Sequence, residues 1–205
     1  MNDAAEFPAV LARCFSCVRA LPPELCKVLA QHYELLCRWN RTVNLTSVSG
    51  LEDSVIRHYC ESLFLGLRLP APAVSVLDVG SGAGFPGIPM ALLRPDCGFT
   101  LAESHRRKAV FLREATRDLP NVTVAPRRAE EVVHGPGGGF GWVVSRAVKW
   151  PDVLRVARTA ACGVGLLVGA DDSAEICREA GWNWREAIPL PWGDRRVLLI
   201  GAPMA

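Results

Sequence analysis

Residues 76–87 read Val76-Leu77-Asp78-Val79-Gly80-Ser81-Gly82-Ala83-Gly84-Phe85-Pro86-Gly87. The short apolar run at the start predicts a buried β-strand, and the glycines after it predict a turn whose backbone approaches a ligand closely. Because proline is tolerated in the first turn of a helix, Pro86 and Pro89 indicate that a helix begins directly after the turn. Ligands of open parallel sheets bind beyond the carboxyl ends of the strands. The stretch therefore predicts a ligand site at the turn.

Two classes of ligand fit this turn. Residues 82–87 match the dinucleotide pattern G-x-G-x-x-G. Glu103 follows the next apolar run, about 20 residues further on, where an acid would hold ribose hydroxyls. Sites for S-adenosylmethionine share both features, so the spacing alone does not separate the two ligands. A P-loop is excluded, because Ile88-Pro89 follows the last glycine where a P-loop has Lys-Ser or Lys-Thr.

Asp78 favours S-adenosylmethionine over a dinucleotide. A carboxylate at this place would repel a pyrophosphate by roughly 3 kcal/mol per charge pair at about 5 Å and an effective dielectric near 20. The same carboxylate would attract the ammonium and sulfonium groups of S-adenosylmethionine. An alternative stays open, in which Asp78 bonds to local N–H groups of the turn.

The rest of the chain predicts an α/β fold. Apolar residues at three- and four-residue steps predict amphipathic helices over 24–39 and 51–67, and these two helices open the chain. After residue 70, short apolar runs alternate with helical patterns, which is typical of βαβ units in a mostly parallel sheet. The predicted strands are 74–79, 98–103, 122–125, 142–145, 164–168 and 197–200, and the predicted helices are 86–94, 105–119, 152–161 and 173–180. Residues 135–141 are glycine-rich and predict a flexible surface loop. We expect a helical part over 1–70 and a Rossmann-like, doubly wound domain over 71–205.

The amino-acid composition excludes few classes of function. The 23 Lys and Arg against 21 Asp and Glu give a net charge of +2, so a nucleic-acid surface would require local clustering of basic residues. The acidic start of the chain does not resemble a secretory signal, and no apolar run reaches the ~18 residues that suggest a membrane span, so we expect a cytoplasmic protein. Cys14 and Cys17 form a C-x-x-C pair without a second pair, and we expect buried reduced thiols rather than a metal site.

Several separate motifs resemble the ribosomal RNA small subunit methyltransferase G family (RsmG, also called GidB). The resemblance covers nearly the whole chain and rests on residues 38–46 (Arg-Trp-Asn-Arg-Thr-Val-Asn-Leu-Thr), 57–62, 78–89, 128–131, 144–147 and the closing Asp194-Arg195-Arg196. It implies a Rossmann-like enzyme that uses S-adenosylmethionine, without a metal, to methylate N7 of a guanine in the decoding region of 16S rRNA. The implied partner is the small ribosomal subunit, and we expect a monomer.

The resemblance also assigns site residues. It implies cofactor contacts at Gly80 and Phe85, an adenine site at Ala129 and Glu130, ribose binding at Glu103, and a place for Arg146 beside the methyl-transfer site. With the turn residues, the predicted cofactor site comprises Asp78, Gly80, Gly82, Gly84, Phe85, Glu103, Ala129, Glu130 and Arg146. Where this chain has Glu61 and Glu103, the family usually has Asp. Where the family has a Lys-Gly pair, this chain has Val168-Gly169, so the role of that lysine is lost or supplied by another residue.

The predicted chemistry needs no general base, because guanine N7 carries a free lone pair and no proton near neutral pH. Catalysis would depend on alignment, and Arg146 is the predicted orienting residue. The base would have to be unpaired or flipped out, since side chains do not reach N7 within an A-form helix. The RNA-binding candidates are Arg41, Asn44, Arg57, His58, Arg106, Arg107, Lys108, Arg128 and Arg195. Two alternatives remain: a non-catalytic RNA-binding or assembly factor with a retained pocket, and an NAD(P)-dependent oxidoreductase.

Overall fold

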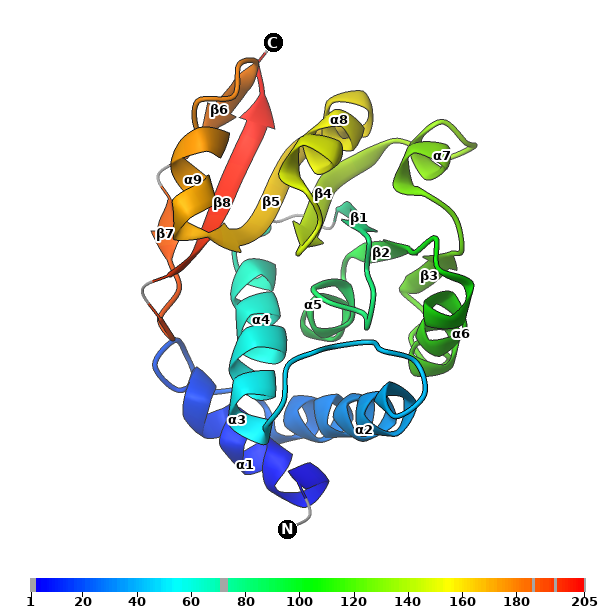
Figure 1. The fold of residues 1–205 in the computed structure, drawn as a ribbon, viewed down its shortest axis with the longest axis vertical. Helices are drawn as coiled ribbons and strands as arrows, with labels where there is room; N and C mark the ends of the chain where they lie inside the picture. The colour runs from blue at the N-terminus through cyan, green and yellow to red at the C-terminus, as the bar shows by residue number, and fades with distance from the viewer. Residues whose placement is uncertain (1–2, 71–73, 186, 194, 205) are drawn as a thin grey trace.

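The structure, a computed structural model, describes residues 3–70, 74–185, 187–193 and 195–204. Its centre is a mixed sheet with helices on both faces (Figure 1). The strands are β1 (Ser75–Val79), β2 (Gly98–Ala102), β3 (Val122–Ala125), β4 (Phe140–Arg146), β5 (Ala161–Gly169), β6 (Trp182–Trp184), β7 (Ile188–Pro189) and β8 (Arg196–Pro203). They pair in the order β3-β2-β1-β4-β5-β8-β6, with β7 beside β8. The first five strands are parallel and β8 is antiparallel to β5, which confirms the predicted mostly parallel α/β sheet.

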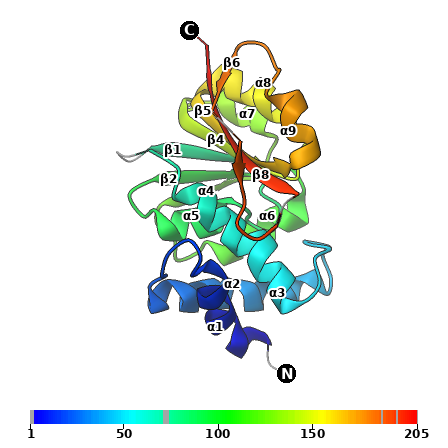
Figure 2. The ribbon, with the colours of Figure 1, turned by 90° about the vertical axis from the view of Figure 1, so that its left-hand side faces the viewer.

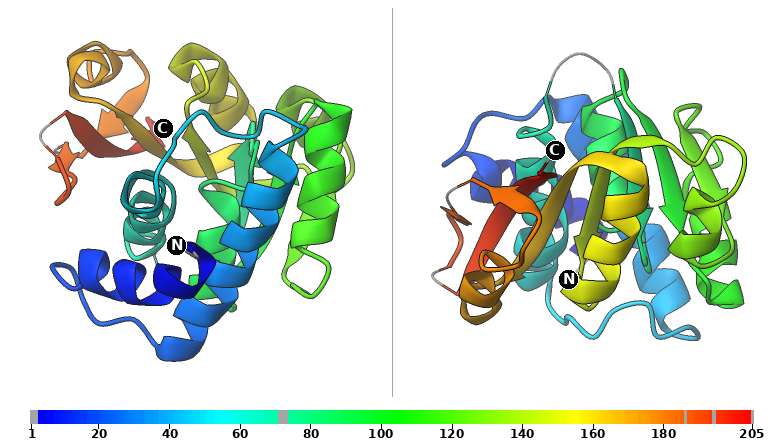
Figure 3. Two further views of the ribbon diagram at one scale, coloured as in Figure 1. Left: turned by 60° about the horizontal axis from the view of Figure 1, so that its bottom comes forward. Right: turned by 90° about the horizontal axis from the view of Figure 1, so that it is seen from above.

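Helices cover the sheet in two groups. They are α1 (Asp3–Phe15), α2 (Pro23–Asn40), α3 (Leu51–Ser54), α4 (Glu61–Gly66), α5 (Gly87–Leu93), α6 (Arg106–Ala115), α7 (Ala129–Val133), α8 (Trp150–Ala160) and α9 (Ala170–Ile176), and a π-helical segment, η1 (Val55–Cys60), joins α3 to α4. Figure 2 shows α1 to α6 on one side of the sheet and α7 to α9 on the other. Seen from above in Figure 3, α8 (yellow) lies in front of the strands that it packs against.

Two hydrophobic cores lie on the two faces of the sheet. Along β1, Val76 belongs to the core under α5, whereas Leu77 and Val79 belong to the core under α8. This alternation explains why the strand is a continuous apolar run: both of its faces are buried, as in other doubly wound sheets. Asp78 is the one ionisable residue in this run, and it points to the first face.

The N-terminal helices extend the first core. Phe7, Leu11 and Phe15 on α1 are spaced by four residues and are fully buried. The prediction that two helices open the chain was therefore incomplete, because α1 precedes them with its own apolar face. The helix predicted over 24–39 is confirmed as α2, and the one over 51–67 is confirmed except that its middle is π-helical.

The structure also differs from the predicted elements elsewhere in the chain. The predicted surface loop over 135–141 was wrong at its end, because Phe140 is buried and begins β4. The last helix begins at Ala170 rather than at residue 173, and α7, β6 and β7 were not anticipated. In the part of the chain that the structure describes, no helix combines the length and the apolarity needed to cross a membrane.

Candidate functional site

The glycine turn after β1 adopts a backbone that suits glycine. Gly80, Gly82 and Gly84 have φ values of +66°, +58° and +87°, a region that other residues rarely adopt. At Gly80 a Cβ atom would also lie 2.5 Å from Cγ2 of Val148, in the loop after β4. The turn therefore brings bare backbone close to the carboxyl ends of β1 and β4, where the sheet order reverses.

Asp78 holds this turn from below. Its Oδ2 accepts hydrogen bonds from Ser81 Oγ at 2.6 Å and from the backbone N–H of Gly87 at 3.0 Å. A Cβ at Gly87 would lie 2.7 Å from the same oxygen, so glycine is needed there as well. The structure thus agrees with the alternative in which Asp78 bonds to local groups of the turn.

The carboxylate of Asp78 is nevertheless incompletely satisfied. It is fully buried, and among the described residues its Oδ1 has no hydrogen-bond partner. Burial raises the pKa of Asp78 to about 7, because desolvation disfavours the charged form more than its two hydrogen bonds stabilise it. A cation bound above the turn would restore the charged form.

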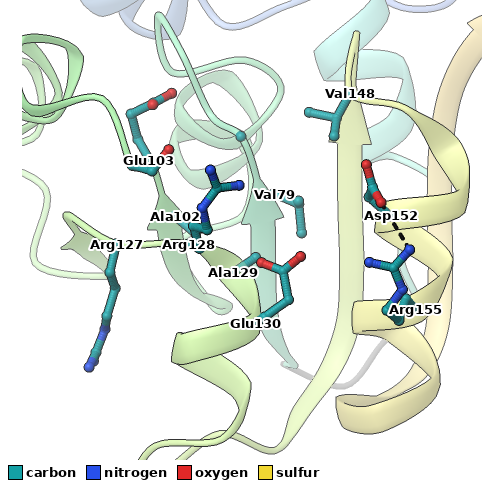
Figure 4. Close-up of a pocket in the computed structure, with 12 residues that line it drawn as sticks. Val79, Ala102, Glu103, Arg127, Arg128, Ala129, Glu130, Val148, Asp152 and Arg155 are labelled. Atoms are coloured by element: carbon teal, nitrogen blue, oxygen red, sulfur yellow. Dashed lines mark ion pairs between the residues drawn. The ribbon is translucent and has the colours of Figure 1, made fainter.

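A pocket of about 290 Å³ lies beside the turn, at the carboxyl ends of β1 and β2 (Figure 4). It is lined by Val79, Gly80, Ala102, Glu103, Ser104, Arg127, Arg128, Ala129, Glu130, Val148, Asp152 and Arg155. The structure therefore brings together Gly80, Glu103, Ala129 and Glu130, four of the predicted cofactor residues. The side chains of Asp78, Phe85 and Arg146 are not part of this lining.

Glu103 links the turn to the pocket. Its Oε2 accepts a hydrogen bond from Gly82 N at 3.0 Å, and its Oε1 accepts one from His105 N at 2.7 Å. The side chain is 8% exposed and its carboxylate faces the pocket. Since each carboxylate oxygen can accept a second hydrogen bond, Glu103 can hold the turn and still accept from a ligand hydroxyl.

Four charged residues in the lining were not predicted for it. Figure 4 shows the Arg128 side chain pointing into the pocket near Glu103, whereas that of Arg127 points away. Asp152 and Arg155, on α8, form an ion pair of 3.1 Å at the opposite wall. The loop after β4 carries Val148 and places α8 against the pocket, which the sequence pattern did not indicate. Arg128, a predicted RNA contact, thus contributes to the pocket beside the glycine turn.

Phe85 is enclosed by residues of the N-terminal helices. Its ring stacks on His58 at a centroid distance of 4.6 Å and meets the edges of Tyr59 at 5.0 Å and His32 at 5.4 Å. Phe85 is 3% exposed. The Phe85 ring therefore packs the glycine turn against the helices that precede residue 70.

Two buried histidines pack against the Phe85 ring in their neutral form. His32 Nδ1 shares a hydrogen bond of 2.8 Å with Tyr59 Oη, and His58 Nε2 shares one of 2.8 Å with Thr46 Oγ1. Burial lowers the pKa of His32 to about 4 and that of His58 to about 3. His32 is core-facing, as predicted. His58, a predicted RNA contact, is 2% exposed and its ring offers no surface to RNA.

Arg146, at the end of β4, is held by the π-helical segment. Its Nη1 donates a hydrogen bond to the carbonyl oxygen of Arg57 at 2.6 Å, and its guanidinium carbon lies 5.4 Å from the centre of the Phe85 ring. In η1 the N–H of Glu61 bonds to the carbonyl of Ile56 rather than to that of Arg57. The Arg57 carbonyl is thereby released for Arg146, which illustrates why π-helical turns recur at functional sites.

The positive charge of Arg146 is partly removed from water. Burial lowers its pKa to about 10, although the negative charges of Glu61 and Asp78 oppose that shift. Glu61 itself is bound to Arg196, with distances of 2.8 Å to Nε and 2.9 Å to Nη2. Arg196 belongs to the closing motif of the sequence but was not predicted as a site residue; Asp194 of that motif lies outside the described residues.

The remaining RNA-binding candidates lie on the surface. Arg41, Asn44, Arg57, Arg106, Arg107 and Arg195 are exposed, and Lys108 is half-buried. The backbone near Asn44 is fixed by Asn40, whose Oδ1 accepts from the N–H groups of Leu45 and Thr46. Arg57 and Arg195 line a common pocket of about 430 Å³ with Glu61 and Arg196.

The family model described as rRNA small subunit methyltransferase G matches residues 25–159, more than half of the chain. The chain belongs to this family. The resemblance seen in the separate motifs is thus confirmed, and the match spans most of α2, the glycine turn, the pocket and β4 with Arg146.

Curated relatives carry the same family name. The ribosomal RNA small subunit methyltransferase G of Dichelobacter nodosus is 38% identical over 174 residues, which cover 82% of this chain and 80% of that relative. The corresponding protein of Nitrosomonas europaea is 46% identical over 110 residues, but the match spans only half of its length. Among solved structures, fibrillarin in its complex with Nop5p has a TM-score of 0.59 at 12% identity, over 71% of this chain and 80% of that one. This likeness supports the Rossmann-like methyltransferase fold alone.

Proposed function

We propose that this protein transfers a methyl group from S-adenosylmethionine to N7 of a guanine in the 16S rRNA of the small ribosomal subunit. The observation that carries the proposal is the pocket beside the glycine turn, with Glu103 and Glu130 in its lining and Asp78 beneath it. The family membership supports the substrate class. We also propose a monomer that acts in the cytoplasm, with the helical part over 1–70 as a subdomain of the methyltransferase domain over 71–205.

The residues present fit S-adenosylmethionine better than a dinucleotide. The buried Oδ1 of Asp78 lacks a partner in the described structure. A cationic ligand beside the turn would stabilise the charged form of this carboxyl group, whereas a pyrophosphate would repel it. Gly80 and Gly82 would contact the methionine part, Glu103 would hold the ribose and Ala129 with Glu130 would border the adenine.

When bound, S-adenosylmethionine supplies a methyl group activated by the positive sulfur. Guanine N7 would react through its lone pair and lose no proton, so the reaction would need no general base from the protein. The task of the protein is therefore alignment and exclusion of water rather than proton transfer. Arg146 would border the reacting atoms, oriented by Phe85 and by the Arg57 carbonyl.

The test combines binding with product analysis. Calorimetry should detect S-adenosylhomocysteine binding and no NADH binding; NADH binding would instead support the oxidoreductase. Small subunits from a strain that lacks the gene should gain N7-methylguanosine on incubation with the protein and S-adenosylmethionine, as judged by mass spectrometry. Binding of S-adenosylhomocysteine with identical methylation in subunits from both strains would favour the non-catalytic assembly factor.

A further inference from the structure

A second pocket adjoins the cofactor pocket and has no assigned role. It measures about 420 Å³ and is lined by Ala147, Val148, Lys149, Trp150, Pro151, Leu167, Val168, Gly169, Asp172 and Arg196. Val148 lines both pockets, so the two are separated by the loop between β4 and α8. The volume lies within the roughly 300–1,000 Å³ of typical small-ligand sites.

The loop that forms this pocket is strained. Ala147 has a φ of +62°, and it is the residue with a left-handed backbone among the described residues other than glycine. Such a conformation is unfavourable and persists where the surrounding structure imposes it, often at a functional site. In this case it turns the chain sharply between Arg146, which faces Phe85, and Lys149, which faces the second pocket.

Helix stability does not explain Lys149, whereas Asp172 lies in the first turn of α9, where an acid suits the helix dipole. Lys149 is the N-cap of α8, where a positive charge opposes the helix dipole, and it is exposed. Asp172, on α9, has its Oδ2 directed over Gly169, where it would lie 3.6 Å from a Cβ at that position. Both residues line the pocket, Lys149 from the start of α8 and Asp172 from the first turn of α9.

We propose that this second pocket receives the target guanine, with Asp172 as acceptor for its N1–H and 2-amino groups and Lys149 as the cation for its phosphate. The inference rests on the proposed function and names the base subsite of that reaction. A carboxylate matches the two adjacent donors on the Watson–Crick edge of guanine, whereas adenine has an acceptor at N1. Trp150 and Leu167 supply apolar surface beside the base.

Asp172 has a further effect on the reaction. As N7 gains the methyl group, the guanine becomes cationic and its N1–H and amino groups become stronger donors. The carboxylate therefore binds the transition state more tightly than the ground state, which raises kcat. Lys149, by contrast, contacts a phosphate whose charge does not change during the reaction, so its contribution is to KM.

The experiment compares Asp172→Asn with the matched control Asp171→Asn, which removes the neighbouring exposed acid outside the lining. On small subunits that lack the modification, we expect Asp172→Asn to lower kcat by about tenfold or more, the loss typical of one charge-assisted hydrogen bond in a transition state. Asp171→Asn should match the wild type. Calorimetry should give both variants the wild-type affinity for S-adenosylhomocysteine, which shows that fold and cofactor pocket are intact.

A second variant tests the phosphate. We expect Lys149→Met to raise KM several-fold with kcat within about twofold of the wild type, and to reduce the dependence of KM on salt. Lys27→Met, an exposed lysine on α2, is its control. Active wild type with Asp172→Asn equal to Asp171→Asn would overturn this inference and leave the proposed function standing. A wild type that neither binds S-adenosylhomocysteine nor methylates the subunit would overturn both.

Discussion

Arg146 donates from Nη1 to the backbone carbonyl of Arg57, which is 89 residues earlier in the chain. The carbonyl is free because η1 has shifted the hydrogen bond of the following turn to Ile56. A residue at the end of β4 is in this way fixed by the backbone of a helix from the N-terminal part. The orientation of Arg146 therefore depends on the local helix geometry rather than on a carboxylate partner.

Arg146→Ala should lower methylation by about tenfold or more while the protein stays folded, because a residue that orients the reacting groups is lost. Arg146→Lys should not restore activity, since an ammonium cannot bond to the Arg57 carbonyl and face Phe85 as a planar group. Initial rates on small subunits, with circular dichroism for the fold, provide the measurement. The matched control is Arg117→Ala, an exposed arginine; an Arg146→Ala rate equal to that of this control would remove Arg146 from the site.

Cofactor affinity should depend on pH through Asp78. Its pKa is raised to about 7 by burial. A bound sulfonium cation would lower that pKa, so binding releases a proton and affinity increases as the pH rises through about 7. In the free protein the sign is opposite: the stability that Asp78 contributes is fully present below its ordinary pKa of 3.8 and is lost as the pH rises through about 7.

Calorimetry of S-adenosylmethionine and of uncharged-sulfur S-adenosylhomocysteine from about pH 6 to 8 would separate the two effects. The slope should be steeper for the sulfonium compound, and Asp78→Asn should flatten it. Equal slopes for both ligands in the wild type would show that Asp78 does not sense the sulfur charge.

Although Glu61 and Arg196 form one ion pair, replacing Arg196 should destabilise the protein more than replacing Glu61. The Glu61 side chain is 3% exposed and that of Arg196 is 34% exposed. Arg196→Met leaves a buried carboxylate without its partner and should destabilise the protein by about 2–4 kcal/mol, whereas Glu61→Gln leaves a cation that reaches water and should cost about 1–2 kcal/mol. Urea unfolding would measure both values, and the reverse order would contradict this account.

The basic start of α6 should contribute to RNA affinity. Arg106 and Arg107 are exposed at a helix N-terminus, where cations oppose the helix dipole. Replacing both residues and Lys108 by Gln should weaken RNA binding and make the slope of log affinity against log salt shallower by about 2–3, near 0.9 per lost phosphate contact. Filter binding at several salt concentrations provides the slope. An unchanged slope would place this surface away from the RNA.

Local patterns predicted much of the fold. The apolar run and glycines of residues 76–87 gave β1, the turn and α5, because burial on both faces and positive φ leave clear marks in a sequence. The face of α1 was missed although Phe7, Leu11 and Phe15 recur at helical spacing. By contrast, neither the shifted hydrogen bonds of η1 nor its contact with Arg146, from a distant strand, leaves such a mark in the sequence.

The candidate site was predictable only where a residue adjoins the turn or matches the family. Gly80, Glu103 and Glu130 fall in the pocket as expected. Asp152 and Arg155 do not follow from their sequence neighbours, because the path of the loop after Ala147 brings α8 to the pocket. His58 was predicted to contact RNA at the surface. Its burial depends on stacking against Phe85, which the sequence around His58 does not indicate.

The enclosure of Phe85 has a consequence for chimeric proteins. Its neighbours His32, His58 and Tyr59 all precede residue 70, whereas the backbone that it anchors forms the cofactor turn. Exchanging the first 70 residues with those of a relative would change the walls around this ring and leave the turn itself untouched. Such hybrids should recover activity only when the donor segment and residue 85 come from the same parent.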